Sequence, residues 1–528
     1  MYDFIRKRLG RRALFQAGIL AGVFRGRAAA AGLTAGGNLY QSIGVRPLIN
    51  ARGTFTIISG SLILPEVRAA MAEASRHHVQ MDELMDAVGA RLAELTKAEW
   101  GMVTCGCSAA LTHATAACVA GGNPDLHVRI PNLAGFPKDE VIIPKHSRNV
   151  YDAAIRAVGA RVIEVGTAEE LDAAFGPRTA MIYILAGPQA DQGPLSTKAI
   201  AEAARRKNVP VLVDAAAEIL TVPNVHLENG ATLVAYSGGK CIRGPQTAGL
   251  LLGRKDLIRA AWVHSSPHHG YARAIKIGKE EAMGMLMAVE MWMKRDHQAE
   301  WNMWLDRLDH VAKRLAPIGG VATELRQPTG LSNKTPSLSI RWDAAKLGVT
   351  GVEVSKLLFT TEPRIALPTG GGRMGNSSPG QTGVSVVPYM LATGEEKIVA
   401  DRLFEALSNP PRKTPPASEP PAVDVSGRWD VRIEYLASAS DHVLHLTQKG
   451  ASIEGTHQGD FVARDLGGSI DGDRVRLSSA YTERHGDSLM FEFTGKATDT
   501  EMSGSLDMGE YLQARWTARR HQPMTRRG

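Results

Sequence analysis

Three short segments combine residue types that could act on a shared ligand. Asp214 ends the apolar segment VPVLVD, at the expected carboxyl end of a buried strand. Lys240 follows the tripeptide SGG and precedes an apolar strand, so its amine has little bulk around it and its apolar neighbours favour the uncharged, nucleophilic form. Residues 104–110 (TCGCSAA) form a small-residue turn into a helix, where free backbone N–H groups and the helix dipole attract an anion.

Together these segments supply the three groups that pyridoxal phosphate requires. The cofactor needs a carboxylate for its pyridinium nitrogen, an amine for its aldehyde carbon and a cradle for its phosphate. Each segment alone has an ordinary structural explanation, such as capping by the aspartate. Their occurrence in this order on a predicted α/β sheet indicates a pyridoxal-phosphate site.

The elements that must position these groups alternate between short apolar strands and helices. This alternation predicts a mostly parallel sheet, covered on both faces, that binds ligands at the carboxyl ends of its strands. The expected strands are residues 101–105, 140–144, 161–165, 180–185, 210–214, 232–236 and 248–253, and the expected helices include 108–119, 149–158, 168–175 and 197–207. Residues 280–315 are expected to form one long helical region.

Composition shifts divide the chain further. Residues 409–422 contain six prolines and almost nothing apolar, which is typical of an extended linker, and the alternating runs beyond it predict a small barrel or sandwich of roughly eight strands. The expected divisions are a signal peptide (1–31), a large cofactor-binding domain with an N-terminal arm (32–315), a small α/β domain (316–408), a proline-rich linker (409–423) and an all-β domain (424–520).

The N-terminus has the layout of an export signal. Arg11 and Arg12 precede an apolar run at 13–24 and small residues at 28–31, which resembles a twin-arginine signal and predicts a periplasmic or otherwise exported protein. The alternative is a cytoplasmic protein with a basic N-terminus. Residues 1–31 hold seven basic side chains and one acid, so they account for most of the net charge of +7. The rest of the 528 residues is near neutral, which argues against a nucleic-acid partner, and no segment is long and apolar enough to span a membrane.

Three other groups of residues allow more than one interpretation. Cys105 and Cys107 could be a redox or metal pair, but small side chains in a tight turn are the simpler explanation. His264, His268 and His269 could bind a metal, although a polar loop at the mouth of the site is the simpler reading, and no metal is expected. The glycines at 370–372 suggest a flexible loop or a substrate lid.

Residues 40–408 resemble the fold-type-I pyridoxal-phosphate enzymes, in the branch that contains seryl-tRNA selenium transferases and D-glucosaminate-6-phosphate ammonia-lyases. The resemblance lies in LINARGTF (48–55), TCGCSAALTHATAACVAGG, VPVLVDAAAE, VAYSGGKCIRGPQTAGLLLGRKDL (234–257) and ARAIKIGKE (272–280). It implies a homodimer or larger homo-oligomer, with Lys240 as the Schiff-base lysine and Asp214 as the pyridinium partner. Cys241 and Arg243 depart from the pattern, so the electrostatics of the pocket are expected to differ.

The resemblance also implies roles for residues around this pair. Gly106, Ser108, Ala109 and Ser237 would hold the phosphate, and His146 would stack on the cofactor ring. Arg148 and Tyr151 would face the substrate, Lys276 and Lys279 would approach a neighbouring subunit's site, and Arg364 would bind the substrate carboxylate. The C-terminal region separately resembles lipocalin-like barrels through SGRWDV, IEGTHQGDF and MSGSLDMGEYLQARWTARR.

The expected activity is that of a lyase on a small-molecule amino substrate. The resemblance favours β-elimination and deamination of a small hydroxy-amino acid or an amino-sugar acid. The same cofactor chemistry also supports an aldolase, a racemase or an aminotransferase. A rival of another class is an exported, non-catalytic ligand-binding protein, although a pure binder would need neither Lys240 nor Asp214.

Overall fold

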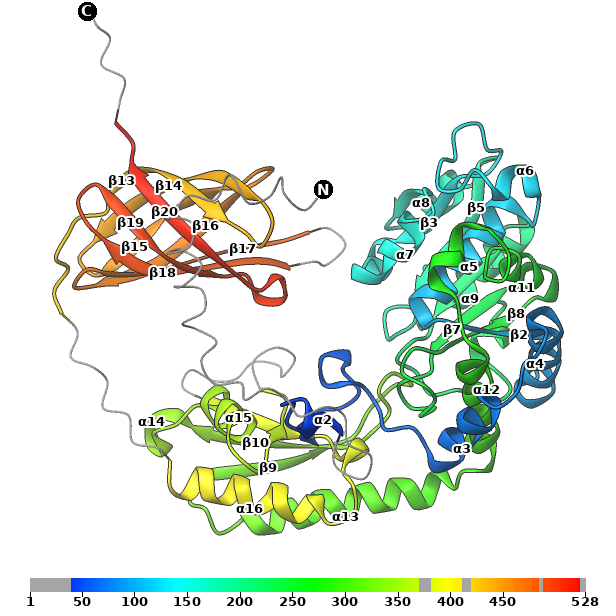
Figure 1. Ribbon diagram of the computed structural model, residues 1–528, viewed down its shortest axis with the longest axis horizontal. Helices are drawn as coiled ribbons and strands as arrows, with labels where there is room; N and C mark the ends of the chain where they lie inside the picture. The colour runs from blue at the N-terminus through cyan, green and yellow to red at the C-terminus, as the bar shows by residue number, and fades with distance from the viewer. Residues whose placement is uncertain (1–38, 370–380, 411–418, 484–487, 523–528) are drawn as a thin grey trace, which may run out of the picture. The chain divides into compact units, whose positions relative to one another are not determined.

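The computed structural model describes residues 39–369, 381–410, 419–483 and 488–522 (Figure 1). The expected signal peptide, the glycines at 370–372 and much of the linker lie outside these residues. Contacts divide the chain into two compact units, one with residues 1–62, 295–329 and 334–412 and the other with 63–294, 330–333 and 413–528. The arm up to residue 62 and residues 295–315 therefore group with the small domain.

A seven-stranded sheet forms the large domain, with the strand order β2-β8-β7-β6-β5-β3-β4. Its strands are β2 (Trp100–Thr104), β3 (Glu140–Pro144), β4 (Arg161–Val165), β5 (Thr179–Leu185), β6 (Val211–Asp214), β7 (Leu233–Ser237) and β8 (Gly249–Gly253). All run in one direction except β8, which is antiparallel to both neighbours. The mostly parallel sheet predicted from the sequence is confirmed.

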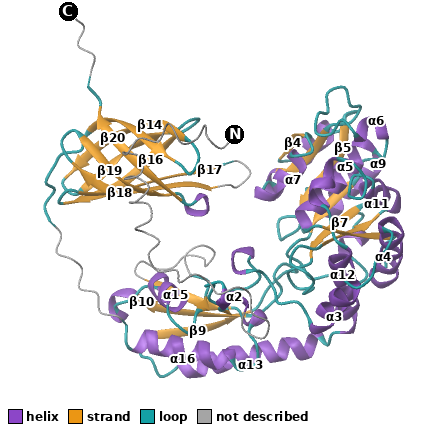
Figure 2. Cartoon of the chain, viewed as in Figure 1, coloured by secondary structure: helices purple, strands orange, loops and turns teal. Residues whose placement is uncertain are grey.

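Helices pack around this sheet (Figure 2). They are α3 (Pro65–Ala74), α4 (Met81–Thr96), α5 (Cys107–Ala120), α6 (Pro124–His127), α7 (Ala153–Arg156), α8 (Ala168–Ala174), α9 (Thr197–Arg206), α10 (Val225–Glu228), α11 (Lys255–Trp262) and α12 (Lys279–Lys294). Helix α5 is buried almost all round, which explains its alanine-rich sequence without a polar face. The helix predicted at 149–158 is shorter, because Asn149 caps a 3-10 turn (Val150–Asp152) before α7 begins.

The small domain has its own sheet and core. Antiparallel strands β9 (Val321–Arg326), β10 (Ser337–Asp343) and β12 (Gln381–Val386) form a sheet in the order β12-β10-β9, and β1 (Ile49–Asn50) pairs in parallel with β11 (Ile365–Ala366). The helices of this unit are α2 (Leu39–Ser42), α13 (His297–Leu315), α14 (Ala344–Leu347), α15 (Gly351–Thr360) and α16 (Glu395–Ser408). The expected single helix at 280–315 is two helices, because Asp296 caps a new start at α13 by accepting from the N–H groups of Gln298 and Ala299.

The C-terminal domain is a closed barrel of eight antiparallel strands (orange to red in Figure 1). The strands are β13 (Gly427–Glu434), β14 (Ala439–Lys449), β15 (Ser452–Gln458), β16 (Ala463–Asp471), β17 (Arg474–Thr482), β18 (Ser488–Ala497), β19 (Glu501–Asp507) and β20 (Gln513–Arg520). Alternate residues point inward, and Trp429, Phe493 and Trp516 fill the core. The barrel prediction is confirmed and the sandwich alternative is wrong, while the lipocalin resemblance stays a prediction. None of the helices that the structure describes is long and apolar enough to cross a bilayer.

Candidate active site

The carboxyl ends of the parallel strands gather the predicted cofactor residues at one edge of the large sheet. Asp214 is the last residue of β6, and Ser237 is the last residue of β7. Helix α5 starts shortly after β2 ends, and His146 lies in the 3-10 turn η2 (Lys145–Ser147) that follows β3. Because these strands run in the same direction, their ends meet where an open α/β sheet binds ligands.

Asp214 is a buried carboxylate held by three donors. It is 2% exposed, and its Oδ2 accepts a hydrogen bond from the Tyr183 hydroxyl at 3.0 Å. Its Oδ1 accepts from the Ala216 N–H at 3.1 Å and from the Cys107 thiol at 3.5 Å. Burial raises the pKa of Asp214, while these hydrogen bonds and the nearby charge of Lys240 oppose the rise. A carboxylate so poorly solvated favours a cationic N–H partner, as a pyridinium would supply.

Lys240 occupies the compact loop that joins β7 to β8. The loop is closed by backbone hydrogen bonds from Gly238 N to Ala248 O at 2.8 Å and from Gly244 N to Gly238 O at 2.8 Å. The charge of Lys240 lowers the pKa of both Asp214 and Cys107, so its amine lies within electrostatic range of the buried carboxylate. The half-buried Lys240 is therefore positioned by backbone geometry at the end of the strand next to Asp214.

The start of α5 forms a cradle for an anion. Its N-cap is Gly106, with a left-handed φ of 86°, and no side chain caps the helix. A Cβ on Gly106 would meet nothing within 4 Å, so the surroundings of this N-cap residue are open. Gly249 of β8 pairs with Thr104 on one side and Ser237 on the other, which brings Ser237 beside this helix start. A Cβ on Gly249 would lie 2.5 Å from Gly106 C, so only glycine allows α5 to pack this closely.

His146 supplies a ring with an unsatisfied nitrogen. Its Nε2 is buried and has no hydrogen-bond partner in the structure. Burial lowers the pKa of His146, so its imidazole is neutral at neutral pH. A neutral ring after β3, a buried carboxylate, a nearby lysine amine and an open helix start are the donor set that pyridoxal phosphate requires, so the residues present fit this cofactor.

Comparisons with known proteins agree with this geometry. The chain is 30% identical over 378 residues to a D-glucosaminate-6-phosphate ammonia lyase from Salmonella typhimurium, which covers 70% of this chain and 97% of that protein. The solved structure of a D-glucosaminate-6-phosphate ammonia-lyase covers 71% of this chain with a TM-score of 0.62. The chain belongs to this family. It is thus a fold-type-I enzyme whose cofactor is pyridoxal phosphate, as the sequence predicted.

Two further relatives are named for other reactions. A 5'-C-glycyluridine monooxygenase-decarboxylase from a Streptomyces species is 32% identical over 299 residues, 54% of this chain and 73% of that enzyme. An L-seryl-tRNA(Sec) selenium transferase from Moorella thermoacetica is 27% identical over 280 residues, 46% of this chain and 55% of that protein. A search against models of protein families finds no match.

The structure of the present protein adds two residues to the site to which the sequence analysis gave no role there. Asn149 Nδ2 donates to the Tyr183 hydroxyl at 2.9 Å, and Tyr183 donates onward to Asp214. Tyr183 lies in the apolar run of β5, and the sequence pattern predicts only that its ring is buried in the core. The available signal was its hydroxyl, because a buried tyrosine hydroxyl needs a partner. Cys107 was read as a small turn residue, but its thiol contacts the catalytic aspartate candidate directly.

Four predicted substrate residues of the large domain have other surroundings in this structure. Arg148 donates to Asp152 at 2.6 Å and to Glu164, so its guanidinium is held in a mostly buried ion pair. A role of Arg148 toward the substrate therefore stays a prediction, and this ion pair would have to open for it. Tyr151 and Lys276 are exposed, and Lys279 pairs with its neighbour Glu280. Their roles toward substrate or a second subunit stay predictions.

Arg364 belongs to the small-domain unit and makes local contacts there. Its Nε donates to the Phe359 carbonyl at 2.9 Å and its Nη1 to the Arg46 carbonyl at 3.2 Å. Its guanidinium also stacks on the Phe359 ring, 4.0 Å from the centroid. These contacts fix the side chain at the start of β11, and a role in binding a carboxylate stays a prediction.

The histidine and cysteine alternatives also have structural outcomes. His264 is fully buried and stacks on His127 with ring centroids 4.4 Å apart, so it is not part of a polar loop. No group of three potential metal ligands occurs among the residues that the structure describes. All four cysteines are free, and burial raises the pKa of Cys107 well above its usual range, which keeps its thiol protonated. Cys107 therefore acts as a hydrogen-bond donor to Asp214 here.

Proposed function

We propose that this protein is an ammonia-lyase that removes a β-substituent and then the amino group from a small hydroxy-amino acid or an amino-sugar acid. The observation that carries the proposal is the placement of Lys240 beside the buried Asp214, next to the open start of α5. The match to the relative named as an ammonia lyase covers 97% of that protein, and it favours elimination over the other reactions.

Each residue of the site has a defined task in this reaction. Bound pyridoxal phosphate supplies a ring that accepts the electron pair left when the substrate loses its α-proton. Asp214 would keep the proton on the ring nitrogen, because a buried carboxylate is stabilised by a neighbouring cation. The Lys240 amine would take the α-proton, and the N–H groups at the start of α5 with Ser237 would hold the phosphate. For a hydroxy substrate, the α-proton and hydroxyl leave as water, and the released enamine hydrolyses to an oxo-acid and ammonia.

A visible absorption spectrum tests the cofactor assignment on the full chain. The wild-type protein reconstituted with pyridoxal phosphate should show a visible band that borohydride removes. Lys240→Ala should lack that band, whereas Lys198→Ala, which changes an exposed lysine on α9, should keep it. A wild-type protein that stays colourless with added cofactor would overturn the enzyme assignment and support a binding protein.

Product analysis separates the lyase from its alternatives. We expect ammonia and an oxo-acid to form from D-glucosaminate, its 6-phosphate or a serine enantiomer. The amount of pyridoxal phosphate bound to the protein should be the same before and after the reaction. Aldehyde formation would indicate an aldolase, loss of optical rotation alone a racemase, and conversion to pyridoxamine phosphate an aminotransferase. Oxygen uptake with release of carbon dioxide would instead indicate chemistry like that for which the Streptomyces relative is named.

We also propose that the protein is exported and works as a homo-oligomer. The support for export is the twin-arginine pattern at Arg11 and Arg12, followed by an apolar and then a small-residue run. Replacing both arginines with lysine should retain the full-length precursor in the cytoplasm, whereas the unaltered chain should appear outside it with a shortened N-terminus. The support for a homo-oligomer is the resemblance to fold-type-I enzymes, which implies that Lys276 approaches a neighbouring subunit. Lys276 is exposed, so Lys276→Glu should lower the assembly mass measured by light scattering without disturbing the core.

A further inference from the structure

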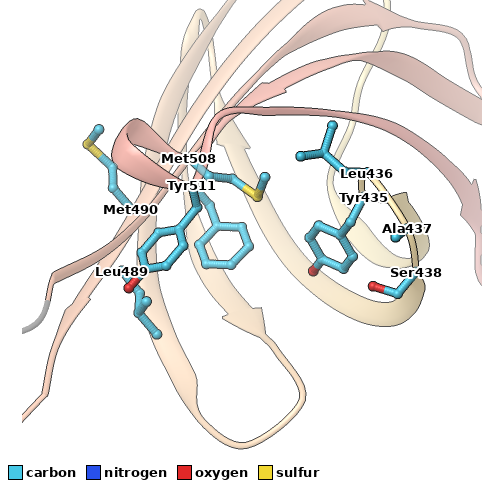
Figure 3. A pocket seen from close by; sticks show the side chains of 9 residues that line it. Tyr435, Leu436, Ala437, Ser438, Leu489, Met490, Met508 and Tyr511 are labelled. Atoms are coloured by element: carbon cyan, nitrogen blue, oxygen red, sulfur yellow. The ribbon is translucent and has the colours of Figure 1, made fainter. Parts of the chain in front are cut away.

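The C-terminal barrel has an apolar pocket at one end. In an up-and-down barrel alternate hairpin connections lie at the same end, and here these include residues 435–438, 459–462 and 508–512. A cavity of about 370 Å³ opens among them, lined mainly by Tyr435, Leu436, Met490, Phe491, Met508 and Tyr511. Figure 3 shows Leu489, Met490 and Tyr511 on one side of this pocket and residues 435–438 on the other.

Exposed apolar side chains occur in three hairpins at this end of the barrel, and two of them, Leu436 and Tyr511, line the pocket itself. Phe461 is 96% exposed and Leu436 is 79% exposed, and each sits in a different hairpin at this end of the barrel. Tyr511 and Leu512 of the third hairpin are also exposed. Exposed apolar side chains that cluster around a cavity are typical of a ligand entrance.

A buried cation lies next to this pocket. Arg464 is 8% exposed, and the alternation of β16 points it inward together with Leu466 and Ile470. Its guanidinium lies over the Phe491 ring, 4.6 Å from the centroid, and Phe491 also lines the pocket. A Cβ on Gly459 would lie 2.7 Å from Arg464 Nη1, so the chain leaves room for the guanidinium at this point.

Two of the three guanidinium nitrogens of Arg464 have no hydrogen-bond partner. These two nitrogens, Nε and Nη1, are both buried. Buried charged donors without an acceptor are costly, so an anionic ligand that satisfies them would gain binding energy from this arrangement. The unpaired donors therefore point to an acceptor that comes from outside the chain.

The neighbouring polar groups, by contrast, satisfy one another. Tyr435, Ser440, His442, His457 and Ser479 form a continuous chain with donor–acceptor distances of 2.7 to 3.0 Å. Burial lowers the pKa of His457 to about 3, so its ring is neutral and leaves the positive charge to Arg464. Among the described residues that face the barrel interior here, Arg464 thus carries the positive charge, close to an apolar mouth.

The charges around Arg464 limit the charge of the ligand. Burial lowers the pKa of Arg464, while Tyr435, Asp460 and Glu483 oppose that change. Since these two acids already act on the guanidinium, a singly charged head group fits this field better than a dianion.

We propose that the barrel binds a small monocarboxylate with an apolar body, its carboxylate on Arg464 and its body in the pocket at the hairpin end. This site is separate in residues and chemistry from the pyridoxal-phosphate site. It gives the C-terminal domain a binding role that does not depend on the lyase assignment.

Calorimetric titration of the full chain with sodium decanoate and with decanol tests the head group. We expect wild-type protein to bind decanoate, and Arg464→Met to bind it roughly tenfold to a hundredfold more weakly, as expected for a lost hydrogen bond to a charged group. Decanol should bind both proteins equally, which also shows that the Arg464→Met barrel is folded. Equal decanoate affinities for the two proteins, or no decanoate binding to wild type, would overturn the proposal.

A surface variant repeats the test without touching the barrel interior. Leu436→Glu places a negative charge in an exposed hairpin at the mouth and should weaken decanoate binding, while Leu436→Gln should weaken it less. Val352→Glu makes the same change on α15, at another exposed apolar residue, and should leave binding unchanged. If Val352→Glu reduced binding as much as Leu436→Glu, the binding would be general surface adsorption and the proposal would be wrong.

Discussion

The hydroxyl of Tyr183 donates a hydrogen bond to Oδ2 of Asp214 at 3.0 Å, deep within the large sheet. Asn149 donates to the same hydroxyl at 2.9 Å, so the tyrosine proton is directed toward the carboxylate. Together with the Ala216 N–H on Oδ1, this bond fixes the plane of the Asp214 carboxylate. The acid is thereby oriented by the protein itself, which reduces the reorganisation needed when a pyridinium binds.

Tyr183→Phe should weaken catalysis and move its pH dependence. The bond from Tyr183 opposes the rise in the pKa of Asp214, so its loss should raise that pKa further and shift the acid limb of kcat/KM to higher pH. A neutral hydrogen bond to a charged group is worth about 1.5–3 kcal/mol, which predicts a loss of roughly tenfold to a hundredfold in kcat/KM.

The matched control is Tyr236→Phe. Tyr236 is also buried in the large sheet, but its hydroxyl accepts from Asn224 at 2.7 Å. The control should lose some stability and keep the wild-type pH profile. An unchanged acid limb in Tyr183→Phe would show that Tyr183 does not tune Asp214.

Asp214→Asn should change the stability of the cofactor-free protein in the direction opposite to its effect on activity. Burial raises the pKa of Asp214 above the ordinary value of an aspartate, so the folded state binds this proton more tightly than the unfolded state. The ionised carboxylate therefore costs stability above the raised pKa, and this cost disappears as the pH falls below about 4.

Thermal melting of the cofactor-free proteins measures this effect. We expect Asp214→Asn to melt at or above the wild-type temperature at neutral pH, with the difference shrinking in acid. Adding pyridoxal phosphate should stabilise wild type more than the variant. A variant that melts well below wild type at neutral pH without cofactor would contradict the direction of the pKa shift.

Gly249→Ala should damage the phosphate cradle through packing alone. The new methyl group would lie 2.5 Å from Gly106 C and 2.7 Å from Cys107 N, so the start of α5 would have to move. Overpacking of this kind costs about 1–3 kcal/mol, and the displaced N–H groups should bind the phosphate less well. We expect a lower melting temperature and a weaker cofactor affinity, measured by absorbance titration.

Gly176→Ala provides the matched control for this substitution. A Cβ on Gly176 would meet nothing within 4 Å, so the same chemical change should leave both quantities near wild type. Cofactor affinity in Gly249→Ala equal to that of the control would show that the α5 start does not hold the phosphate.

The sequence predicted the large sheet well because buried parallel strands are continuous apolar runs with clear ends. Strands β3 and β4 begin and end where the sequence placed them, and the other five differ by one or two residues. Asp214 and Lys240 could be singled out because one ends such a run and the other follows the small residues after the next run, and because a third segment suited to an anion accompanies them. The same logic cannot find Tyr183, since its ring satisfies the apolar pattern of β5 and only its hydroxyl carries the function.

Long-range pairing limited the rest of the prediction. The resemblance predicts that Arg148 faces the substrate, but its guanidinium pairs with Asp152, four residues along the chain, and with Glu164, which the pairing of β3 with β4 brings beside it. The break between α12 and α13 depends on the capping geometry of Asp296, which competes with a strong helical pattern on both sides. The pairing of Arg148 and the helix break both depend on contacts formed only in the folded chain.

His146 tests whether the ring beside the cofactor acts by stacking or by hydrogen bonding. Its position after β3 and its buried, unpartnered Nε2 are compatible with either. If it stacks, His146→Ala should weaken pyridoxal-phosphate binding by roughly twofold to tenfold, the equivalent of about 0.5–1.5 kcal/mol, and His146→Phe should restore most of the affinity.

The pH dependence provides a second readout for His146. Burial lowers the pKa of His146, so any change in cofactor affinity caused by protonation of its ring should begin at a lower pH than for an ordinary histidine. His146→Phe should lack that change. If His146→Phe bound cofactor as weakly as His146→Ala, the unpartnered Nε2 would be the essential group, and His146→Gln would then be expected to recover binding where phenylalanine does not.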